Sequence, residues 1–213
     1  MSQIEQVGIE GEAGHDAPAL RRAGSRPVAV VCFIAVAMLV VGLDLGIKYT
    51  AFEHVAGQPV ILDAGIEHPA HVVPLHSPVD VVPGVLSLHL TLNDGAVFGI
   101  WSGGRWVFIV VSVLAVGVLL RLFWRSPADA WVYHLGLALV LGGAMGNLYD
   151  RMRYGVVRDM FRLFPETGLW PWIFNLADAA LMAGVALVVI MIYLHERRSQ
   201  QQRRAQAPQT DRG

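Results

Sequence analysis

The sequence has little charge and almost no cysteine. Asp, Glu, Lys and Arg make up 15% of its 213 residues, whereas a soluble domain usually carries about a quarter. The formal net charge is −1, so no basic excess points to a nucleic-acid partner. The single cysteine, Cys32, excludes an intrachain disulfide and a cysteine-rich metal centre. Apolar residues reach 54%, which is too high for an ordinary soluble domain.

Four long apolar segments account for much of this composition. A helix needs about 20 mostly apolar residues to cross a bilayer, and four segments come close to that length or exceed it. We therefore predict an all-α integral membrane protein whose membrane domain covers residues 27–195. The polar residues 1–26 and the basic residues 196–213 are predicted to be disordered cytoplasmic tails. The predicted transmembrane helices cover about residues 27–48, 106–124, 130–151 and 173–194.

Lysine and arginine are missing from residues 49–104, which separate the first two helices. Because basic residues mark the cytoplasmic side of a membrane protein, this segment is predicted to lie on the outer face, with both termini in the cytoplasm. Alternating polar and apolar residues at 85–92 predict a small β-rich structure there. One observation conflicts with this topology, because the loop 150–172 carries several arginines yet falls on the outer face. We expect partners such as Asp150 to hold some of them.

Charged residues near or inside the helices are the first candidates for function, because each costs roughly 2.5–3.5 kcal/mol to insert into a membrane. Asp44 and Lys48 are four residues apart, so they share a helix face and can pair. For these two residues alone, we favour a structural ion pair. Asn93, Asp94 and Gly95 form a turn signal. Two interpretations stay open for this turn: a simple entry into the second helix, or a backbone segment that approaches a substrate.

A second polar cluster lies at the end of the third helix. Gly142 and Gly146 are four residues apart, which favours close helix packing. Asn147, Asp150 and Arg151 follow at spacings that place an amide, a carboxylate and a guanidinium on one helix face. Arg151 is suited to clamping a carboxylate or binding a lipid phosphate.

Two further aspartates stand among apolar residues near the membrane boundary. Asp159 follows the third helix, and Asp178 lies three residues after Asn175 at the start of the fourth. A helix N-terminus favours a carboxylate, so an N-capping role for Asp178 stays open. Two close aspartates cannot both ionise cheaply and therefore share a proton. Such a pair is suited to peptide hydrolysis, in which one carboxylate activates water and the other carboxyl group polarises the carbonyl.

The residues alone leave three classes of function open. One is an aspartyl peptidase. A zinc protease is not supported, because the motif H-E-x-x-H begins at His195 but fails at Ser199. Another is a non-catalytic four-helix scaffold. The remaining class is a proton-coupled transporter, although the internal repeats usual in transporters are not visible. Its relay groups would be Asp44, Asp150, Asp159 and Asp178.

Five blocks of polar and small residues follow one another along the chain. They are Asp44-x-x-x-Lys48, Asn93-x-Gly95-x-x-Phe98-Gly99, Gly142-Gly143-x-x-Gly146-Asn147-x-x-Asp150-Arg151, Gly155-x-Val157-x-Asp159 and Phe174-Asn175-x-Ala177-Asp178. In this order the blocks resemble the lipoprotein signal peptidase (signal peptidase II) family. The resemblance covers about residues 28–195, and it is specific because all blocks occur together on four apparent helices.

The resemblance implies an aspartyl endopeptidase of the bacterial inner membrane that cuts prolipoproteins just before a diacylglyceryl-modified cysteine. It assigns catalysis to Asp159 and Asp178, near the outer face. It implies no metal, no organic cofactor and no nucleic-acid partner, and a monomer surrounded by membrane lipids. Segment 55–80 is longer than expected for the family, which predicts an extra outer loop over the site. The residues expected to position the substrate or support the site are Asn93, Gly95, Asn147, Asp150, Arg151, Asn175, Asp44 and Lys48.

Overall fold

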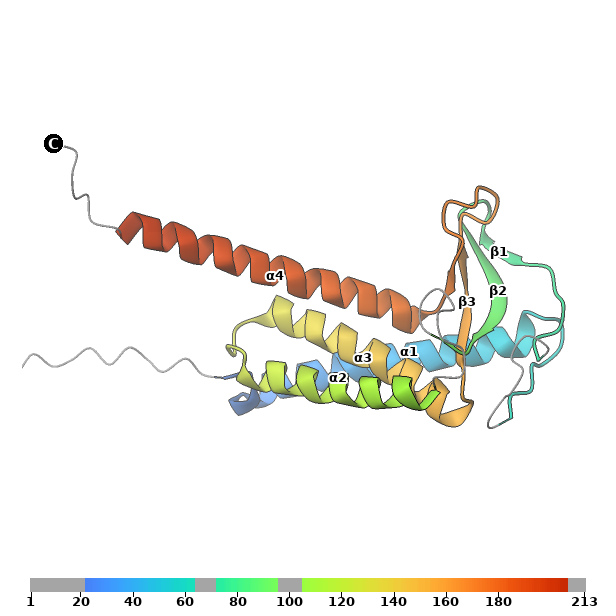
Figure 1. The fold of residues 1–213 in the computed structure, drawn as a ribbon, viewed down its shortest axis with the longest axis horizontal. Helices are drawn as coiled ribbons and strands as arrows, with labels where there is room; N and C mark the ends of the chain where they lie inside the picture. Colours follow the sequence, from blue (N-terminus) through green and yellow to red (C-terminus); the bar gives the residue numbers. More distant parts are fainter. Residues whose placement is uncertain (1–21, 64–71, 96–104, 207–213) are drawn as a thin grey trace, which may run out of the picture.

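The computed structural model describes residues 22–63, 72–95 and 105–206. Four helices lie side by side, and a small sheet sits at one end of them (Figure 1). All four helices are long and apolar enough to cross a membrane. The helices are α1 (Pro27–His54), α2 (Arg105–Arg125), α3 (Trp131–Arg153) and α4 (Leu176–Gln206), and the strands are β1 (Val79–Val82), β2 (Leu86–Asn93), β3 (Val157–Leu163) and β4 (Ile173–Phe174).

Helix α3 is the most buried of the four, because it packs against α1, α2 and α4. Small residues make this possible. A Cβ atom added to Gly142 would lie 2.8 Å from the carbonyl oxygen of Ala37 in α1, and one added to Gly143 would collide with the carbonyl oxygen of Ala177 in α4. Membrane helices approach closely where such small residues face a neighbour. Helix α4 is therefore held directly against the end of α3 that carries the polar cluster.

We expect Gly143→Ala to destabilise the protein by about 1–3 kcal/mol, as extra carbon in a packed interior does. The added methyl group pushes the start of α4 away from α3. Gly117→Ala in α2 is the matched control, because nothing lies within 4 Å of a Cβ atom at that position. Thermal unfolding of both purified variants in detergent checks this prediction. Equal midpoints for the two variants would contradict it.

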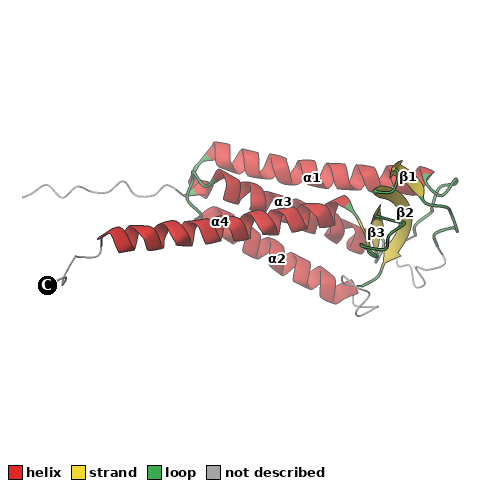
Figure 2. Cartoon of the chain, turned by 90° about the horizontal axis from the view of Figure 1, so that it is seen from above, coloured by secondary structure: helices red, strands yellow, loops and turns green. Residues whose placement is uncertain are grey.

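The four strands form one antiparallel sheet in the order β1-β2-β3-β4. Strand β3 follows α3 through a turn in which Gly155 has a φ of +87°, a value that glycine adopts without strain. Leu90 of β2 and Met160 of β3 are buried with Phe52 near the end of α1. This cluster fixes the sheet to the helices. The sheet lies at the end opposite the start of α1 and the end of α4, as both views show (Figures 1 and 2).

The predicted fold class is confirmed, with four helices and a small sheet. The sheet is larger than predicted, because β3 and β4 come from the segment between α3 and α4. An isolated hairpin is only marginally stable in water, and these two strands supply the additional pairing. Residues 173–174 consequently belong to β4, and α4 begins at Leu176.

Two further boundaries differ from the prediction. Helix α1 continues to His54, beyond the predicted end at 48. Helix α4 continues to Gln206, into the segment 196–213 that was predicted to be a disordered tail. This stretch is rich in Arg and Gln, which are good helix formers, and extending an existing helix avoids the cost of a new nucleus. The predicted N-terminal tail falls largely on residues 1–21, outside the described residues.

Candidate active site

Asp159 lies on β3, directly opposite Thr91 of β2, and its side chain is buried. Its Oδ1 atom accepts a hydrogen bond of 2.6 Å from the Nδ2 atom of Asn175. Its Oδ2 atom accepts one of 3.2 Å from the Nδ2 atom of Asn93, at the end of β2. The strand pairing therefore brings two residues that are 66 positions apart in sequence into contact at one carboxyl group.

Asp178 lies in the first turn of α4 and is partly exposed. Its Oδ1 atom accepts a hydrogen bond of 2.8 Å from the Nδ2 atom of Asn147 in α3. Its Oδ2 atom accepts one of 3.3 Å from the backbone N–H of Asn175. In return, the Oδ1 atom of Asn175 accepts the backbone N–H of Asp178 at 2.9 Å. This reciprocal arrangement is that of a capping box, with Asn175 as the N-cap residue and Asp178 three positions later.

The same capping residue joins the two aspartates. Because the Oδ1 atom of Asn175 faces α4, its Nδ2 group points to Asp159, and it also lies 3.1 Å from the Oδ1 atom of Asn147. Asn147 in turn donates to Asp178. Two amide side chains thus bridge the two carboxyl groups. Asp178 takes part in the helix cap as the partner of Asn175, the N-cap residue, and its catalytic role stays a prediction.

The surroundings of Asp159 favour its neutral form. Burial raises its pKa to about 7, and the nearby negative charge of Asp178 acts in the same direction. The hydrogen bonds from Asn93 and Asn175 and the charge of Lys48 oppose this rise. One carboxyl group that keeps its proton near neutral pH beside a second carboxylate provides an acid and a base in one place.

A buried ion network lies behind the two aspartates. The Nζ atom of Lys48 is 2.7 Å from Asp44 and 3.2 Å from Asp150, and all three side chains are fully buried. Lys48 also donates to the Oδ1 atom of Asn147 at 3.2 Å, so it fixes which end of that amide points to Asp178. The predicted ion pair between Asp44 and Lys48 is confirmed. It lies against the start of α4, because Asp44 accepts the backbone N–H of Ala177 at 2.9 Å.

Arg158 was not among the predicted site residues, although the network depends on it. Its guanidinium lies 2.8 Å from the Oδ1 atom of Asp150, and its backbone N–H bonds the Oδ2 atom of the same carboxylate at 3.1 Å. With Asp44, Asp150, Lys48 and Arg158, the network carries two negative and two positive groups. The expectation that Asp150 holds an arginine of the loop 150–172 is confirmed, because Arg158 pairs with it. The signal available in the sequence was that a buried carboxylate needs a charged partner.

Arg151 and Gly95 contact each other beside Asn93, the residue that bonds Asp159. The Nη2 atom of Arg151 donates to the carbonyl oxygen of Gly95 at 3.3 Å, and its guanidinium lies over the ring of Phe108, 5.1 Å from the centroid. The N–H of Gly95 bonds the Oδ1 atom of Asn93 at 3.1 Å. The polar residues expected to act together are therefore gathered in one region. The rest of the block that contains Phe98 and Gly99 falls on residues 96–104, which lie outside the described residues.

Within residues 22–63, 72–95 and 105–206, no group of three His, Cys, Asp or Glu side chains is arranged to hold a metal ion. The buried polar groups of the site already have protein partners. The carboxylates of Asp159 and Asp178 accept amide hydrogen bonds, and those of Asp44 and Asp150 are ion-paired. The chemistry that this set of residues can perform is proton transfer between two carboxyl groups and a bound reactant.

A family model described as signal peptidase (SPase) II matches residues 36–194. A protein of Lactobacillus gasseri named lipoprotein signal peptidase is 33% identical over 169 residues, which cover 78% of this chain and 96% of the relative. A protein of the same name from Desulfitobacterium hafniense is 37% identical over 120 residues, covering 56% of this chain and 77% of the relative. A solved structure of a bacterial membrane enzyme shares the fold with a TM-score of 0.62 at 24% identity, over 86% of this chain and 96% of that chain.

Proposed function

The chain belongs to the signal peptidase II family, and from this we propose that it is an aspartyl endopeptidase that cuts prolipoproteins just before the lipidated cysteine. It is a bacterial multi-pass membrane protein of a protease family that removes signal peptides from prolipoproteins. The observation that carries the aspartyl mechanism is the bridge from Asp159 through Asn175 and Asn147 to Asp178. This bridge holds two carboxyl groups around one reacting centre.

The different environments of the two aspartates assign their roles. Asp159 is buried and keeps its proton near neutral pH, so it donates that proton to the carbonyl oxygen of the scissile peptide bond. Asp178 is partly exposed, so it accepts a proton from the attacking water. The water oxygen bonds to the carbonyl carbon to give a neutral tetrahedral diol. Asp178 then returns its proton to the leaving nitrogen as the C–N bond breaks, and one diol hydroxyl restores the proton of Asp159.

The surrounding residues place the substrate against the aspartates. Asn93 and Gly95 form a turn beside Asp159, and Arg151 faces the same turn. We assign these groups to the substrate backbone and to the residue that bears the lipid. The buried network of Asp44, Lys48 and Asp150 supports Asn147 from behind.

The arrangement of the helices supports the proposed topology. The start of α1 and the end of α4 lie at the end of the bundle opposite the sheet (Figures 1 and 2). The basic residues near both termini favour the cytoplasmic side for that end. The sheet and the aspartates then lie near the outer face of the inner membrane. Exposed apolar side chains on all four helices are suited to contact lipid, and we propose that the protein acts there as a monomer.

A gel-shift assay tests the proposed function with the full chain purified in detergent. The substrates are a diacylglyceryl-modified prolipoprotein and its unlipidated form. We expect cleavage of the lipidated form only, with the new N-terminus at the modified cysteine. Cleavage at another position, or equal cleavage of both forms, would contradict the proposed specificity. No cleavage by a folded protein would contradict the activity itself.

The raised pKa of Asp159 predicts how the rate depends on pH. Because the proposed mechanism needs the protonated form, we expect kcat to fall as the pH rises through about 7. A carboxyl group whose pKa is raised on folding stabilises the folded state at low pH. The stability that Asp159 contributes should therefore decline as the pH rises from 3.8, its pKa in the unfolded chain, to about 7. Rates and unfolding midpoints measured across this range check both parts. A rate that stays constant well above neutral pH would assign the acid role to another group.

A further inference from the structure

Strand β2 has neighbours on both edges, but one of these edges is paired along only part of its length. On one side it pairs with β3 as far as Asn93, whereas β1 pairs on the other side only with residues 86–88. In the part of the chain that the structure describes, no strand continues β1 beside residues 89–93. Among residues 22–63, 72–95 and 105–206, the second half of β2 therefore has a free edge, and a free edge can pair with an extended peptide.

One end of this free edge is closed by a histidine. The N–H of Leu90 donates to the Nε2 atom of His76 at 3.1 Å, and the Nδ1 atom of the same ring lies 3.0 Å from the carbonyl oxygen of Pro74. Successive residues of a strand direct their N–H and C=O groups to opposite sides. Leu92 is opposite Arg158, whose own N–H and C=O groups bond Asp150 and Asn175 rather than β2. This pair is therefore not hydrogen-bonded, and Leu92 presents its N–H and C=O groups on the same side as Leu90.

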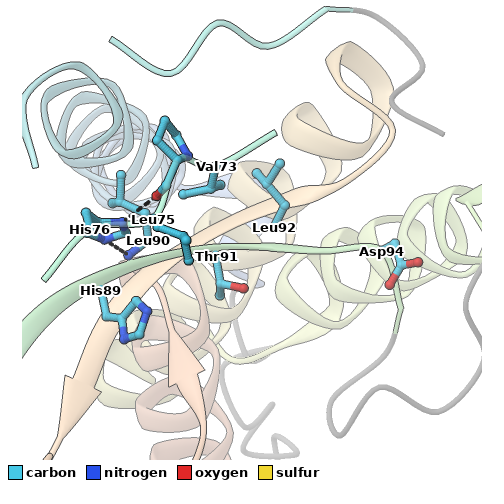
Figure 3. Close-up of a pocket in the computed structure, with 9 residues that line it drawn as sticks. Val73, Leu75, His76, His89, Leu90, Thr91, Leu92 and Asp94 are labelled. Carbon is cyan, nitrogen blue, oxygen red and sulfur yellow. Dashed lines mark hydrogen bonds between the residues drawn. The ribbon is translucent and has the colours of Figure 1, made fainter. Parts of the chain in front are cut away.

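A cavity of about 350 Å³ runs along this edge (Figure 3). Its size falls within the range of roughly 300–1,000 Å³ that is usual for ligand sites. His76 lies near one end and Asp94 at the other, with Leu90 and Leu92 between them. Its outer wall is the segment that contains Val73. This segment belongs to residues 55–80, the region predicted to be an extra outer loop over the site.

The cavity ends one residue from a contact with Asp159, although no member of the candidate catalytic pair lines it. Its end at Asp94 adjoins Asn93, whose side chain bonds Asp159. From Leu90 to Asp94 the strand advances about 13 Å, at roughly 3.3 Å per residue. This length accommodates about four residues of an extended chain. A peptide lying there would have one end near Asn93, which contacts Asp159.

We propose that the residues following the scissile bond bind as an added strand on the free edge of β2, in the cavity between Leu92 and the segment that contains Val73. This inference rests on the proposed function. The signal peptide is apolar and belongs with the helices, whereas the residues that line the cavity belong to β2 and to the segments that flank the sheet. The polar chain after the cleavage site is the part of the substrate that leaves the membrane there. Main-chain hydrogen bonds to Leu92 provide affinity, as in other cases of strand addition.

The test uses two lipidated peptides with the full-length protein in detergent. One ends at the modified cysteine as an amide, and the other continues for four further residues. We expect kcat/KM to be about tenfold higher for the longer peptide, the gain that corresponds to 1.4 kcal/mol of added binding. Equal values would overturn the strand-addition site and leave the proposed function intact. Failure to cleave either peptide would overturn the proposed function and this inference with it.

Methylating single backbone nitrogens of the longer peptide tests the strand geometry directly. Alternate residues of an added strand direct their N–H groups to β2. Methylation should therefore lower kcat/KM strongly either at the second and fourth residues or at the third, and only slightly at the other set. The sensitive positions should lose most of the gain in kcat/KM, and the others little. Similar losses at all three positions would overturn strand addition.

A substitution in the protein provides an independent test of the same cavity. Leu75 lines the cavity and its side chain is exposed, so Leu75→Trp should be tolerated while it narrows the space. We expect a KM about fivefold or more higher for the longer peptide, an effect on binding of roughly 1 kcal/mol, with unchanged kinetics for the shorter one. The matched control is Ile61→Trp, which alters an exposed residue of the same outer segment away from the cavity. An equal effect on both peptides would overturn the assignment.

Discussion

Replacing Asp159 or Asp178 with Asn is expected to abolish detectable cleavage, with kcat reduced about a thousandfold, because positioned acid and base groups contribute typically 10²–10⁴-fold each. An amide at position 178 accepts no proton from water, and an amide at position 159 is a poor proton donor to the carbonyl oxygen. Single-turnover cleavage of the lipidated substrate measures the loss.

The loss should occur without unfolding. Asn and Asp have nearly the same shape, and the folded protein already disfavours the charged form of Asp159, as its raised pKa shows. The unfolding midpoint of Asp159→Asn near neutral pH should therefore stay close to that of the parent. Asp80→Asn is the matched control, because Asp80 is an exposed carboxylate on β1 of the same sheet. Near-normal turnover by either active-site variant would remove that residue from the catalytic pair.

Lys48→Met is expected to destabilise the protein by about 3–5 kcal/mol, the usual cost of removing one partner from a buried ion pair. The substitution leaves the carboxylate of Asp44 fully buried without its cation, whereas Asp150 retains Arg158. It also removes the donor to Asn147, so that amide can turn away from Asp178. Both the unfolding midpoint and kcat should fall. Arg121→Met in α2 is the control, because Arg121 is exposed.

A second variant separates charge from packing. Adding Asp44→Asn to Lys48→Met removes the isolated carboxylate, so part of the lost stability should return. A double-mutant cycle over the two positions should give a coupling energy within the range of roughly 0.5–3 kcal/mol that contacting residues show. Additive effects of the two substitutions would mean that the ion pair contributes little to the fold.

The helices and most of the candidate site could be predicted from the sequence, because a bilayer makes polar residues conspicuous. Asp44, Lys48, Asn147 and Asp150 stand out in apolar segments, and the cost of inserting them requires a reason for their presence. The spacing of four between Asp44 and Lys48 was sufficient to predict their pairing, since contacts within one helix depend only on local geometry.

Contacts between strands could not be predicted in the same way. Asn93 meets Asp159 only because β2 and β3 pair in one particular register, and a register depends on the whole sheet. The role of Arg158 could not be predicted for the same reason, since Arg158 lies on strand β3 and its partner Asp150 lies on helix α3. Asn175 was predicted near Asp178, but its contact with Asp159 follows from the short strand β4 that precedes it.

The ion pair between Asp44 and Lys48 also bears on how the protein is made. Both residues belong to α1 and are one helical turn apart, so this helix neutralises its own buried charges. It can therefore enter the bilayer as a locally neutral segment before α3 and α4 have been synthesised. Asp150 pairs with the same lysine and also with Arg158, which the ribosome adds eight residues later. In the proposed mechanism the catalytic centre is completed only when the last helix arrives with Asp178, so an unfinished chain in the membrane should have no peptidase activity.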